Sequence, residues 1–344
     1  MGGKMDNNLN VMYLTDNNYA IFAGVSILSL FENNKSFDEI NVYVIDDSIS
    51  QENKSIYLGI AQKYNRNIIF LDLSEGIRIL KEMHAPTYRN SYTTYLKLFA
   101  FNLLPENVHR IFFIDSDSVI VGNLGNIMNI DLNGNMIGAV KDGIVHSYKV
   151  ALGYSPNDSW YNMGIMLVDV DMWKAQDAQG KVVNQLKKRN AYIAVDQDIL
   201  NITQHNSIMA IDAKYNAMPH HYVYSYDAFM KAFPQGGFYT KEEIESSQQN
   251  AIVRHFERFI GEGPWHKNTV HPYTQLFDYY LAMSPWKNYE KKKANTNLTL
   301  KIEKILYKIF PHDVFVYIWA MGFNHYLKQR NDEYKNNTNV KNVC

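Results

Sequence analysis

The sequence predicts an α/β fold in which a mixed, mainly parallel sheet is flanked by helices. Two observations carry this prediction. Short apolar segments alternate with segments of helical periodicity through the first 115 residues, and four of the apolar segments end at an aspartate or directly before one. Strands that alternate with helices pair in parallel through right-handed crossovers, and ligands of such open sheets bind beyond the carboxyl ends of the strands. The chain of 344 residues, 46% of them hydrophobic, is long enough for a large core.

Three predicted helices separate the first four predicted strands. The strands are residues 10–15, 40–46, 67–72 and 110–115, and the helices are residues 19–30, 51–64 and 91–105. The helix over 91–105 is expected to end at Pro105, because proline cannot continue a helix.

The second half of the chain predicts further strands and helices and one loop. The predicted strands are residues 136–142, 164–170, 207–212 and 251–256, and the predicted helices are residues 171–189 and 196–204. Residues 222–238 are aromatic and contain glycine, which predicts a loop over a site. Because no internal repeat or long linker is visible, the simplest division is a catalytic domain, 5–283, and a helical C-terminal region, 284–344.

The C-terminal region is basic and aromatic. Residues 284–344 hold eleven Lys or Arg against five Asp or Glu, a net charge of +6, so the remainder carries −7 within a chain of net charge −1. The small total charge argues against nucleic acid as a partner. Ile302, Ile305, Leu306 and Ile309 follow helical spacing among lysines. Two interpretations stay open: a helical pair packed on the catalytic domain, or an interfacial anchor whose lysines meet anionic lipid.

Cysteine use and the apolar runs predict a reducing, cytoplasmic location. Cys344 is the only cysteine, so no internal disulfide and no cysteine-based metal site is expected. No signal peptide is visible, and Met5 would make a natural initiator. The longest apolar run, 314–323, is half the length of a membrane-spanning helix. We therefore expect a cytoplasmic protein, with peripheral contact at the inner face of the cytoplasmic membrane as an added option.

Aspartates line one edge of the predicted sheet. The first four strands end at Asp16, Asp46-Asp47, Asp72 and Asp115-Ser116-Asp117. Two carboxylates one residue apart would repel each other, and a divalent cation removes that penalty. Carboxylate oxygens select hard ions such as Mg²⁺ or Mn²⁺, and a histidine ligand favours Mn²⁺. The plainer alternative is that Asp117 caps a helix and Asp115 faces water.

The same residues also fit a phosphatase nucleophile. In haloacid-dehalogenase-type phosphatases, an apolar strand leads into a D-x-D sequence whose first aspartate attacks phosphorus and whose second acts as acid and base. That resemblance requires the motif near the N-terminus and a Gly-Asp metal motif downstream. Here three strand–helix units precede Asp115 and no Gly-Asp pair occurs in the chain, so the sequence disfavours this alternative.

Five segments in a fixed order resemble family 8 glycosyltransferases, a GT-A-fold group that includes bacterial lipooligosaccharide galactosyltransferases and glycogenin. The segments are LTDNNYAIFAGVSILSL, TTYLKLFAFNLLP…RIFFIDSDSVIVGNL, WYNMGIMLVDV, AVDQDILN and HFERFIGEGPW. The resemblance covers the chain from Asn10 to Trp265, and the ordered set is far more specific than D-x-D alone. It implies a GT-A fold, a Rossmann-like sheet, and transfer of a sugar from a UDP-sugar donor.

The resemblance implies a metal and diphosphate site. Asp115 and Asp117, with His255, would hold Mn²⁺, or Mg²⁺ in its place, across the diphosphate of UDP, and Ser116 and Gly261 would lie at the donor. Without the other motifs, His255 is simply a histidine that ends a strand.

The resemblance also implies a nucleoside site. Thr15, Asp16 and Tyr19 would bind uracil and ribose, because a strand-end aspartate can accept from hydroxyls or from the uracil N–H. Tyr19 is equally well a core residue of an amphipathic helix.

Three further residues are implied around the donor sugar. Asn162, Asp196 and Gln197 would surround it, with Gln197 beneath the anomeric carbon and Asp196 on sugar hydroxyls. Family members retain the anomeric configuration, and an amide is a poor nucleophile, so front-face substitution is favoured over a covalent intermediate on Asp196. On its own, the D-Q-D segment would pass as a helix N-terminus. Asp142 matches a position that faces the acceptor, and its plain alternative is a turn.

Two positions depart from the family pattern. Lys97 stands where arginine is common, so a planar fork becomes a point charge and donor contacts are expected to differ. Gly263 stands where the family has a diphosphate-binding lysine, in a segment two residues longer. Arg258 and Lys267 are candidates to supply the missing charge.

Together these segments predict a metal-dependent, retaining glycosyltransferase. The donor would be UDP-glucose or UDP-galactose, and the acceptor a hydroxyl of a glycan, lipid-linked sugar or glycoprotein. Alternatives from other classes are a catalytically inactive UDP-sugar-binding protein and self-glycosylation on tyrosine, as in glycogenin. Glucose and galactose differ at one stereocentre, so the sequence does not separate them.

Overall fold

The computed structural model describes residues 8–85, 87, 91–143, 146–188, 192 and 194–336. Cys344 and Met5, on which two expectations rested, lie outside these residues.

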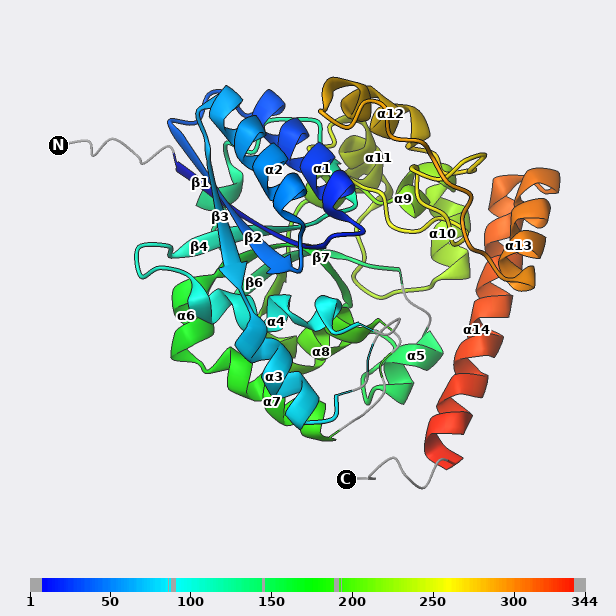
Figure 1. The fold of residues 1–344 in the computed structure, drawn as a ribbon. Helices are drawn as coiled ribbons and strands as arrows, with labels where there is room; N and C mark the ends of the chain where they lie inside the picture. Colours follow the sequence, from blue (N-terminus) through cyan, green and yellow to red (C-terminus); the bar gives the residue numbers. More distant parts are fainter. Residues whose placement is uncertain are drawn as a thin grey trace. The chain divides into compact units, whose positions relative to one another are not determined.

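Seven strands form one sheet in the order β3-β2-β1-β4-β7-β6-β8 (Figure 1). These strands are β1 (Asn8–Asp16), β2 (Glu39–Asp47), β3 (Asn67–Asp72), β4 (Arg110–Asp115), β6 (Ile137–Lys141), β7 (Tyr161–Asp169) and β8 (Ile208–Ala210). The described residues also include two short strands outside this sheet, β5 (Ser118–Ile120) and β9 (Val253–His255).

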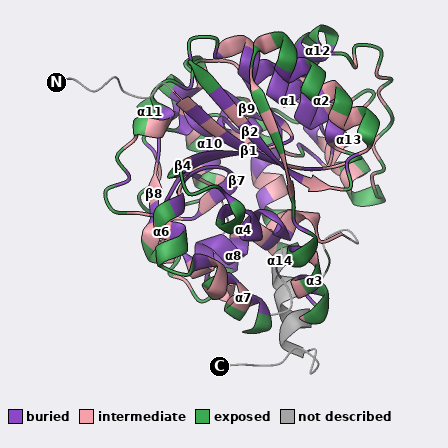
Figure 2. Ribbon diagram, turned by 60° about the vertical axis from the view of Figure 1, so that its left-hand side comes forward, coloured by how far each residue is buried: buried purple, intermediate pink, exposed green. Residues whose placement is uncertain are grey.

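The sheet is mixed and mainly parallel, as the sequence predicted. β1 pairs in parallel with β2 and β4, β2 with β3, and β6 with β8. β4 pairs with β7 in the antiparallel sense, with Phe113 opposite Met166. The centre of β4, Ile111–Ile114, is fully buried, as expected for an apolar strand covered on both faces (Figure 2).

Helices cover both faces of the strands β1 to β4 (Figure 1). α1 and α2 lie on one face, and α3, α4, α6, α7 and α8 lie on the other. Their bounds are α1 (Ala20–Asn33), α2 (Gln51–Tyr64), α3 (Ser74–Glu82), α4 (Lys97–Ala100), α6 (Val170–Ala175), α7 (Ala178–Lys188) and α8 (Val195–Thr203). α2 shows why the boundaries fall where they do: the Ser50 hydroxyl accepts from Asn53 N at its start, and Asn65 ends it in a left-handed conformation.

The chain divides into two compact units. The first, here called the sheet unit, comprises Met1–Ala139 and Met163–Ile211, and the second unit comprises Val140–Asn162 and Asp212–Cys344. The second unit holds α5 (His146–Ala151), α9 (Pro219–Val223), α10 (Tyr226–Ala232), α11 (Lys241–Gln249), α12 (Thr274–Met283), α13 (Leu298–Ile309) and α14 (His312–Asn336). Over the described residues of both units, 3₁₀ turns lie at Thr93–Tyr95, Phe101–Leu103, Ile127–Asn129, His205–Ser207 and Ala213–Asn216. The predicted domain boundary between residues 283 and 284 stays a prediction.

Three expected elements differ in detail. The helix over 91–105 is broken into two 3₁₀ turns around the four-residue α4. The helix over 171–189 is divided into α6 and α7, because Asp177 adopts a positive φ of 47° between them. The loop expected over 222–238 is wrong where α9 and α10 lie, up to Val223 and over Tyr226–Ala232, whereas residues 233–238 are irregular as predicted; Ser225 begins α10 by accepting from Ala228 N.

The C-terminal helices pack within the second unit. α14 contacts α10, α5 and α13, and Tyr307 of α13 packs with Phe259, Ile260 and Phe315 in a buried cluster. Over the described part of the chain, no helix combines the length and the apolar character needed to cross a membrane.

Candidate metal and nucleotide site

The predicted row of aspartates exists at the carboxyl edge of the sheet. Asp16 lies opposite Asp47, Asp46 opposite Asp72, and Asp115 opposite Leu14 in the strand pairing. Most of these side chains stabilise the turns that follow them. Asp16, Asp46 and Asp72 accept from the backbone N–H groups of Tyr19, Ile49 and Ser74 at 2.9, 2.8 and 2.8 Å, and Asp47 accepts from the Thr93 hydroxyl. Asp115 and Asp117 instead lie close to His255.

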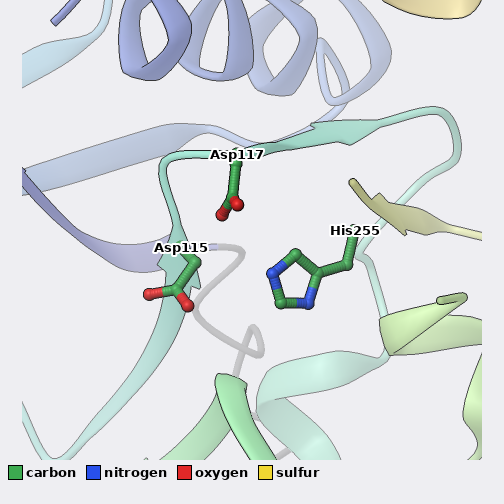
Figure 3. Close-up of side chains that lie close together, drawn as sticks. All are labelled: Asp115, Asp117 and His255. Atoms are coloured by element: carbon green, nitrogen blue, oxygen red, sulfur yellow. The ribbon is translucent and has the colours of Figure 1, made fainter. Parts of the chain in front are cut away.

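Asp115, Asp117 and His255 form a group that could hold a metal ion (Figure 3). Each residue offers one ligand atom, and these atoms all lie within 4.8 Å of one another. Two carboxylates with one imidazole suit a hard divalent ion of the Mg²⁺ or Mn²⁺ type. The helix-cap alternative for Asp117 is wrong, because strand β5 and not a helix follows it.

Lys97 joins two of the predicted residues within the sheet unit. Its ammonium lies 2.5 Å from Asp196 and 3.6 Å from Asp115, and it donates to the Met163 carbonyl at 2.9 Å. The side chain is 2% exposed. Burial alone would lower the pKa of Lys97, but the charges of Asp115 and Asp196 outweigh it and hold the pKa above its usual 10.5. Lys97 is therefore a buried cation that binds two acidic groups of the site.

The D-Q-D segment opens α8, and its three residues have different surroundings. Asp196 is bound by Lys97, and Gln197 Oε1 accepts from Met163 N at 3.3 Å. Asp198 lies within the first turns of the helix, is fully buried and accepts from Ala194 N at 3.0 Å, so it satisfies the backbone N–H of the residue that precedes the helix. The interpretation of the segment as a helix N-terminus therefore explains the role of Asp198. Asp196 and Gln197 instead contact Lys97 and Met163.

The nucleoside candidates, and the donor candidate Ser116, already have local partners. Buried Thr15 donates to the Asp16 carbonyl at 3.0 Å, and buried Ser116 donates to the Leu14 carbonyl at 2.5 Å. Tyr19 is half-buried at the start of α1, with its ring 5.4 Å from Phe22 in an edge-on contact. The contacts of Thr15, Asp16 and Tyr19 with a nucleoside, and of Ser116 with the donor, stay predictions.

The second unit contributes a polar cluster that the sequence only partly predicted. Asn162 Nδ2 donates to Glu257 at 2.8 Å and lies 3.4 Å from Asp142. His220 lies 4.0 Å from Asp142 and 3.7 Å from Glu257, and its ring stacks on Phe229. Asn162 and Asp142 were expected in the site, but His220 and Glu257 were not. The position of Glu257 between His255 and Arg258 in the motif HFER was the available signal.

The segment that lacks the family lysine has a structural reason for glycine. A Cβ atom at Gly263 would lie 2.3 Å from the Trp265 ring, so a side chain there requires the ring to move. Gly261 has a positive φ of 72°, and a Cβ there would lie 2.6 Å from Leu300 of α13. Both glycines are therefore fixed by close packing.

A lysine from outside the motif reaches this segment. Lys304 of α13 donates to both oxygens of Glu262, at 2.8 and 2.7 Å, and to the Asn268 carbonyl at 2.7 Å. Of the two expected candidates, Arg258 donates to the Gly261 carbonyl at 3.4 Å, and Lys267 is exposed. Sequence reasoning missed Lys304 because it lies 41 positions beyond Gly263.

Comparison with known sequences defines the class of this protein. The sequence pattern of Glycosyl transferase family 8 matches residues 10–269, and the chain belongs to this family. It is therefore a glycosyltransferase.

Two curated relatives match along most of their length. General stress protein A of Bacillus subtilis (strain 168) is 24% identical over 291 residues, which cover 82% of this chain and 96% of that protein. Lipopolysaccharide 1,2-glucosyltransferase of Escherichia coli (strain K12) is 27% identical over 298 residues, which cover 85% of this chain and 83% of that protein.

Solved structures share the fold. Galactosyltransferase LgtC in complex with donor and acceptor sugar analogs superposes with a TM-score of 0.64 at 22% identity, over 80% of this chain and 96% of LgtC. The apo structure of the bifunctional glycosyltransferase WbbM gives 0.67 at 21% identity, over 84% of this chain and 52% of that one. The expected GT-A fold is confirmed.

Proposed function

We propose that the chain is a metal-dependent, retaining glycosyltransferase that transfers glucose or galactose from a UDP-sugar to a hydroxyl group. The acceptor would be a glycan, a lipid-linked sugar or a glycoprotein. The observation that carries the proposal is the group of Asp115, Asp117 and His255 at the carboxyl edge of the sheet. Two relatives are named a lipopolysaccharide 1,2-glucosyltransferase and a lipopolysaccharide 1,3-galactosyltransferase, which supports a hexose donor.

The metal would be Mn²⁺ or Mg²⁺, held by Asp115, Asp117 and His255. A divalent ion at this position supplies positive charge to the diphosphate leaving group. Thr15, Asp16 and Tyr19 would bind the nucleoside, and Ser116 and Gly261 would lie along the donor. Asn162 would contact the donor sugar, and Asp142 would face the acceptor.

The surroundings of Asp196 and Gln197 support front-face substitution. The Asp196 carboxylate is paired with the Lys97 ammonium at 2.5 Å, which stabilises its charge and weakens it as a nucleophile. Gln197 is a neutral amide, which is a poor nucleophile. A donor phosphate oxygen would then take the proton of the acceptor hydroxyl, while Gln197 lies beneath the anomeric carbon.

A donor panel tests this proposal. The chain is incubated with UDP-glucose, UDP-galactose or GDP-mannose, with Mn²⁺ or with EDTA, and nucleotide release is measured. We expect release from one UDP-hexose, dependent on Mn²⁺, and an α-configured product by NMR. Binding of UDP without release, across donors and sugar acceptors, would contradict the proposal and identify a binding protein. An inverted product would contradict the retaining mechanism.

We further propose that α13 contacts an anionic membrane surface at the inner face of the cytoplasmic membrane. Its inward face packs through Tyr307 on Phe259 and Phe315, as the packed-helix interpretation predicted. Its outward face is apolar, with Leu298, Ile302, Ile305 and Ile309 exposed by 72%, 47%, 55% and 68%. Spacings of four, three and four residues set these side chains on one stripe.

Charge complementarity selects lipid as the partner of this stripe. Lys301 and Lys308 are exposed on the same helix, and each lysine near an anionic surface contributes roughly 1 kcal/mol. A triple variant, Ile302→Ser, Ile305→Ser and Ile309→Ser, leaves the buried face intact. We expect it to lose flotation with vesicles containing phosphatidylglycerol, whereas the wild-type chain floats. Equal flotation of both proteins would contradict the assignment.

A further inference from the structure

A chain of hydrogen bonds links His255 to two carboxylates through two buried asparagines. His255 Nδ1 lies 3.1 Å from Asn216 Oδ1, and Asn216 Nδ2 donates to Asn162 Oδ1 at 2.9 Å. Asn162 Nδ2 then donates to Glu257 at 2.8 Å, with Asp142 at 3.4 Å. All five residues belong to the second unit. His255, Asn216 and Asn162 are 3%, 0% and 4% exposed, so each polar atom needs a partner inside the protein.

The carboxylate end determines the direction of every bond in this chain. A carboxylate only accepts hydrogen bonds, so Asn162 must turn its NH₂ group toward Glu257. Its carbonyl oxygen then faces Asn216, which must turn its own NH₂ group toward Asn162. The Asn216 carbonyl oxygen therefore faces His255 Nδ1, which must carry the proton.

The protonated Nδ1 leaves the lone pair of His255 on Nε2. In Figure 3, the ring nitrogen farther from the backbone, Nε2, points toward Asp115 and Asp117. A neutral imidazole that donates from one nitrogen is held in one tautomer and orientation, and its other nitrogen is the metal ligand. The hydrogen bond to Asn216 thus selects the form of His255 that can bind a cation.

We propose that Asn216 is a positioning residue for the metal ligand: the carboxylates of Glu257 and Asp142 fix the tautomer of His255 through Asn162 and Asn216. The inference rests on the proposed function, because it takes His255 to be a metal ligand. It explains why a residue outside every recognised motif is fully buried in the site. It also links His255 to Asn162, the candidate for contact with the donor sugar.

The backbone holds Asn216 in place independently of its side chain. Asn216 ends the 3₁₀ turn Ala213–Asn216, and the next residue, Ala217, forms an isolated parallel bridge with Arg254. His255 N donates to the Ala217 carbonyl at 3.2 Å. A side-chain substitution at Asn216 therefore tests the hydrogen bond and leaves the backbone contacts in place.

The test uses the full-length chain, with Mn²⁺ as the probe. In Asn216→Ala, we expect Mn²⁺ affinity, measured by electron paramagnetic resonance with UDP present, to fall 10- to 100-fold. In the metal-free wild-type protein, long-range ¹H–¹⁵N NMR should show His255 with a protonated Nδ1, whereas Asn216→Ala should show a mixture of tautomers. An unchanged affinity and an unchanged tautomer in Asn216→Ala would overturn the proposal.

Asn216→Asp separates the hydrogen bond from simple packing. A carboxylate at residue 216 still accepts from His255 Nδ1. Because this hydrogen bond is kept, Mn²⁺ affinity should stay within about threefold of wild type. The aspartate no longer donates to Asn162, so the rate of transfer should fall while the metal is retained. Loss of Mn²⁺ in Asn216→Asp equal to that in Asn216→Ala would overturn the proposal.

Asn34→Ala is the matched control. Asn34 is fully buried, like Asn216, and hydrogen-bonds to the Leu30 carbonyl and Leu124 N. We expect it to lower the melting temperature but to leave Mn²⁺ affinity unchanged. A loss of affinity equal to that in Asn216→Ala would overturn the proposal.

Asp117→Asn separates the positioning role of Asn216 from the proposed metal site itself. If Asp117→Asn loses Mn²⁺ and Asn216→Ala does not, the inference fails and the proposed function stands, whereas no loss in Asp117→Asn removes the metal site itself.

Discussion

Two lysines are buried to a similar degree but bind opposite kinds of partner. Lys97 in the sheet unit is 2% exposed and lies between the carboxylates of Asp115 and Asp196. Lys149 in the second unit is 0% exposed, and among the described residues its partners are neutral oxygens. It donates to the Asp158 and Pro156 carbonyls at 2.7 and 3.4 Å and to Gln235 at 3.1 Å.

The partners decide the direction of each pKa shift. Burial pulls down the pKa of both ammonium groups, but the pKa of Lys97 is raised because two carboxylates outweigh the burial. The pKa of Lys149 falls to about 8, because burial outweighs the more distant charges of Asp158 and Asp142. A buried cation paired with carboxylates is typical of a functional site. A buried cation bonded to carbonyl oxygens is typical of a residue that stabilises loops.

Removal of the Lys97 charge is expected to have the largest effect among the lysine variants. Lys97→Met leaves the Asp115 and Asp196 carboxylates beside an apolar group. Breaking such a buried pair costs about 3–5 kcal/mol of stability, and we expect donor turnover to fall at least 100-fold. Lys97→Arg keeps the charge and should retain measurable turnover. The measurements are kcat at saturating donor and thermal unfolding.

Lys149→Met is the comparison for this variant. Lys149 has no assigned contact with substrate, so its loss should leave kcat within about threefold while lowering the melting temperature. Equal losses of turnover in the two methionine variants would remove the distinction between the two lysines.

The pH dependence of stability is the next effect in size. The folded state holds the pKa of Lys149 at about 8, below the 10.5 of the unfolded chain. Between these values the unfolded chain binds more protons, so this residue makes stability rise with pH, by about 2 kcal/mol from pH 8 to 10. Lys97 has the opposite sign: its raised pKa gives a contribution that is complete below pH 10.5 and is lost above the folded pKa.

Urea unfolding of wild type and Lys149→Met at pH 7, 8, 9 and 10 measures this rise. The difference between the two proteins should be flat from pH 7 to 8 and should then change in favour of wild type. A difference that is constant up to pH 10 would show that Lys149 keeps its ordinary pKa.

A third lysine offers the smallest effect. Lys304 has a side chain 21% exposed and binds Glu262, whose side chain is 7% exposed. Because water still reaches the lysine, we expect a coupling energy of about 1 kcal/mol. A double-mutant cycle of Lys304→Met and Glu262→Gln, followed by urea unfolding, measures it. A coupling as large as the full loss in Lys97→Met would contradict the ranking by burial.

The sheet and its aspartate edge could be predicted because they depend on local sequence. Apolar runs such as 110–115 specify strands, and their parallel order brings the ends together. Asp115 and Asp117 could be chosen from that edge because they lie one residue apart. His255 needed the family resemblance, since nothing local distinguishes a histidine that ends a short strand.

The contacts between distant residues could not be predicted. Asn216 donates a hydrogen bond to Asn162, 54 positions away, and Lys304 pairs with Glu262 across 42 positions. Neither belongs to a periodic pattern, so only the packed structure reveals them. The segment 222–238 was expected to be a loop because it contains glycines and aromatic residues. Ser225, however, is a capping residue, and it begins α10 within this segment.

The most direct test of the central claim compares two aspartates on the same sheet edge. Asp117 belongs to the group with Asp115 and His255, whereas Asp72 ends β3 and accepts from Ser74 N. With UDP-glucose and UDP-galactose as donors, Mn²⁺-dependent UDP release should be abolished in Asp117→Asn and unchanged in Asp72→Asn. Wild-type UDP release by Asp117→Asn would contradict the claim that this group holds the catalytic metal.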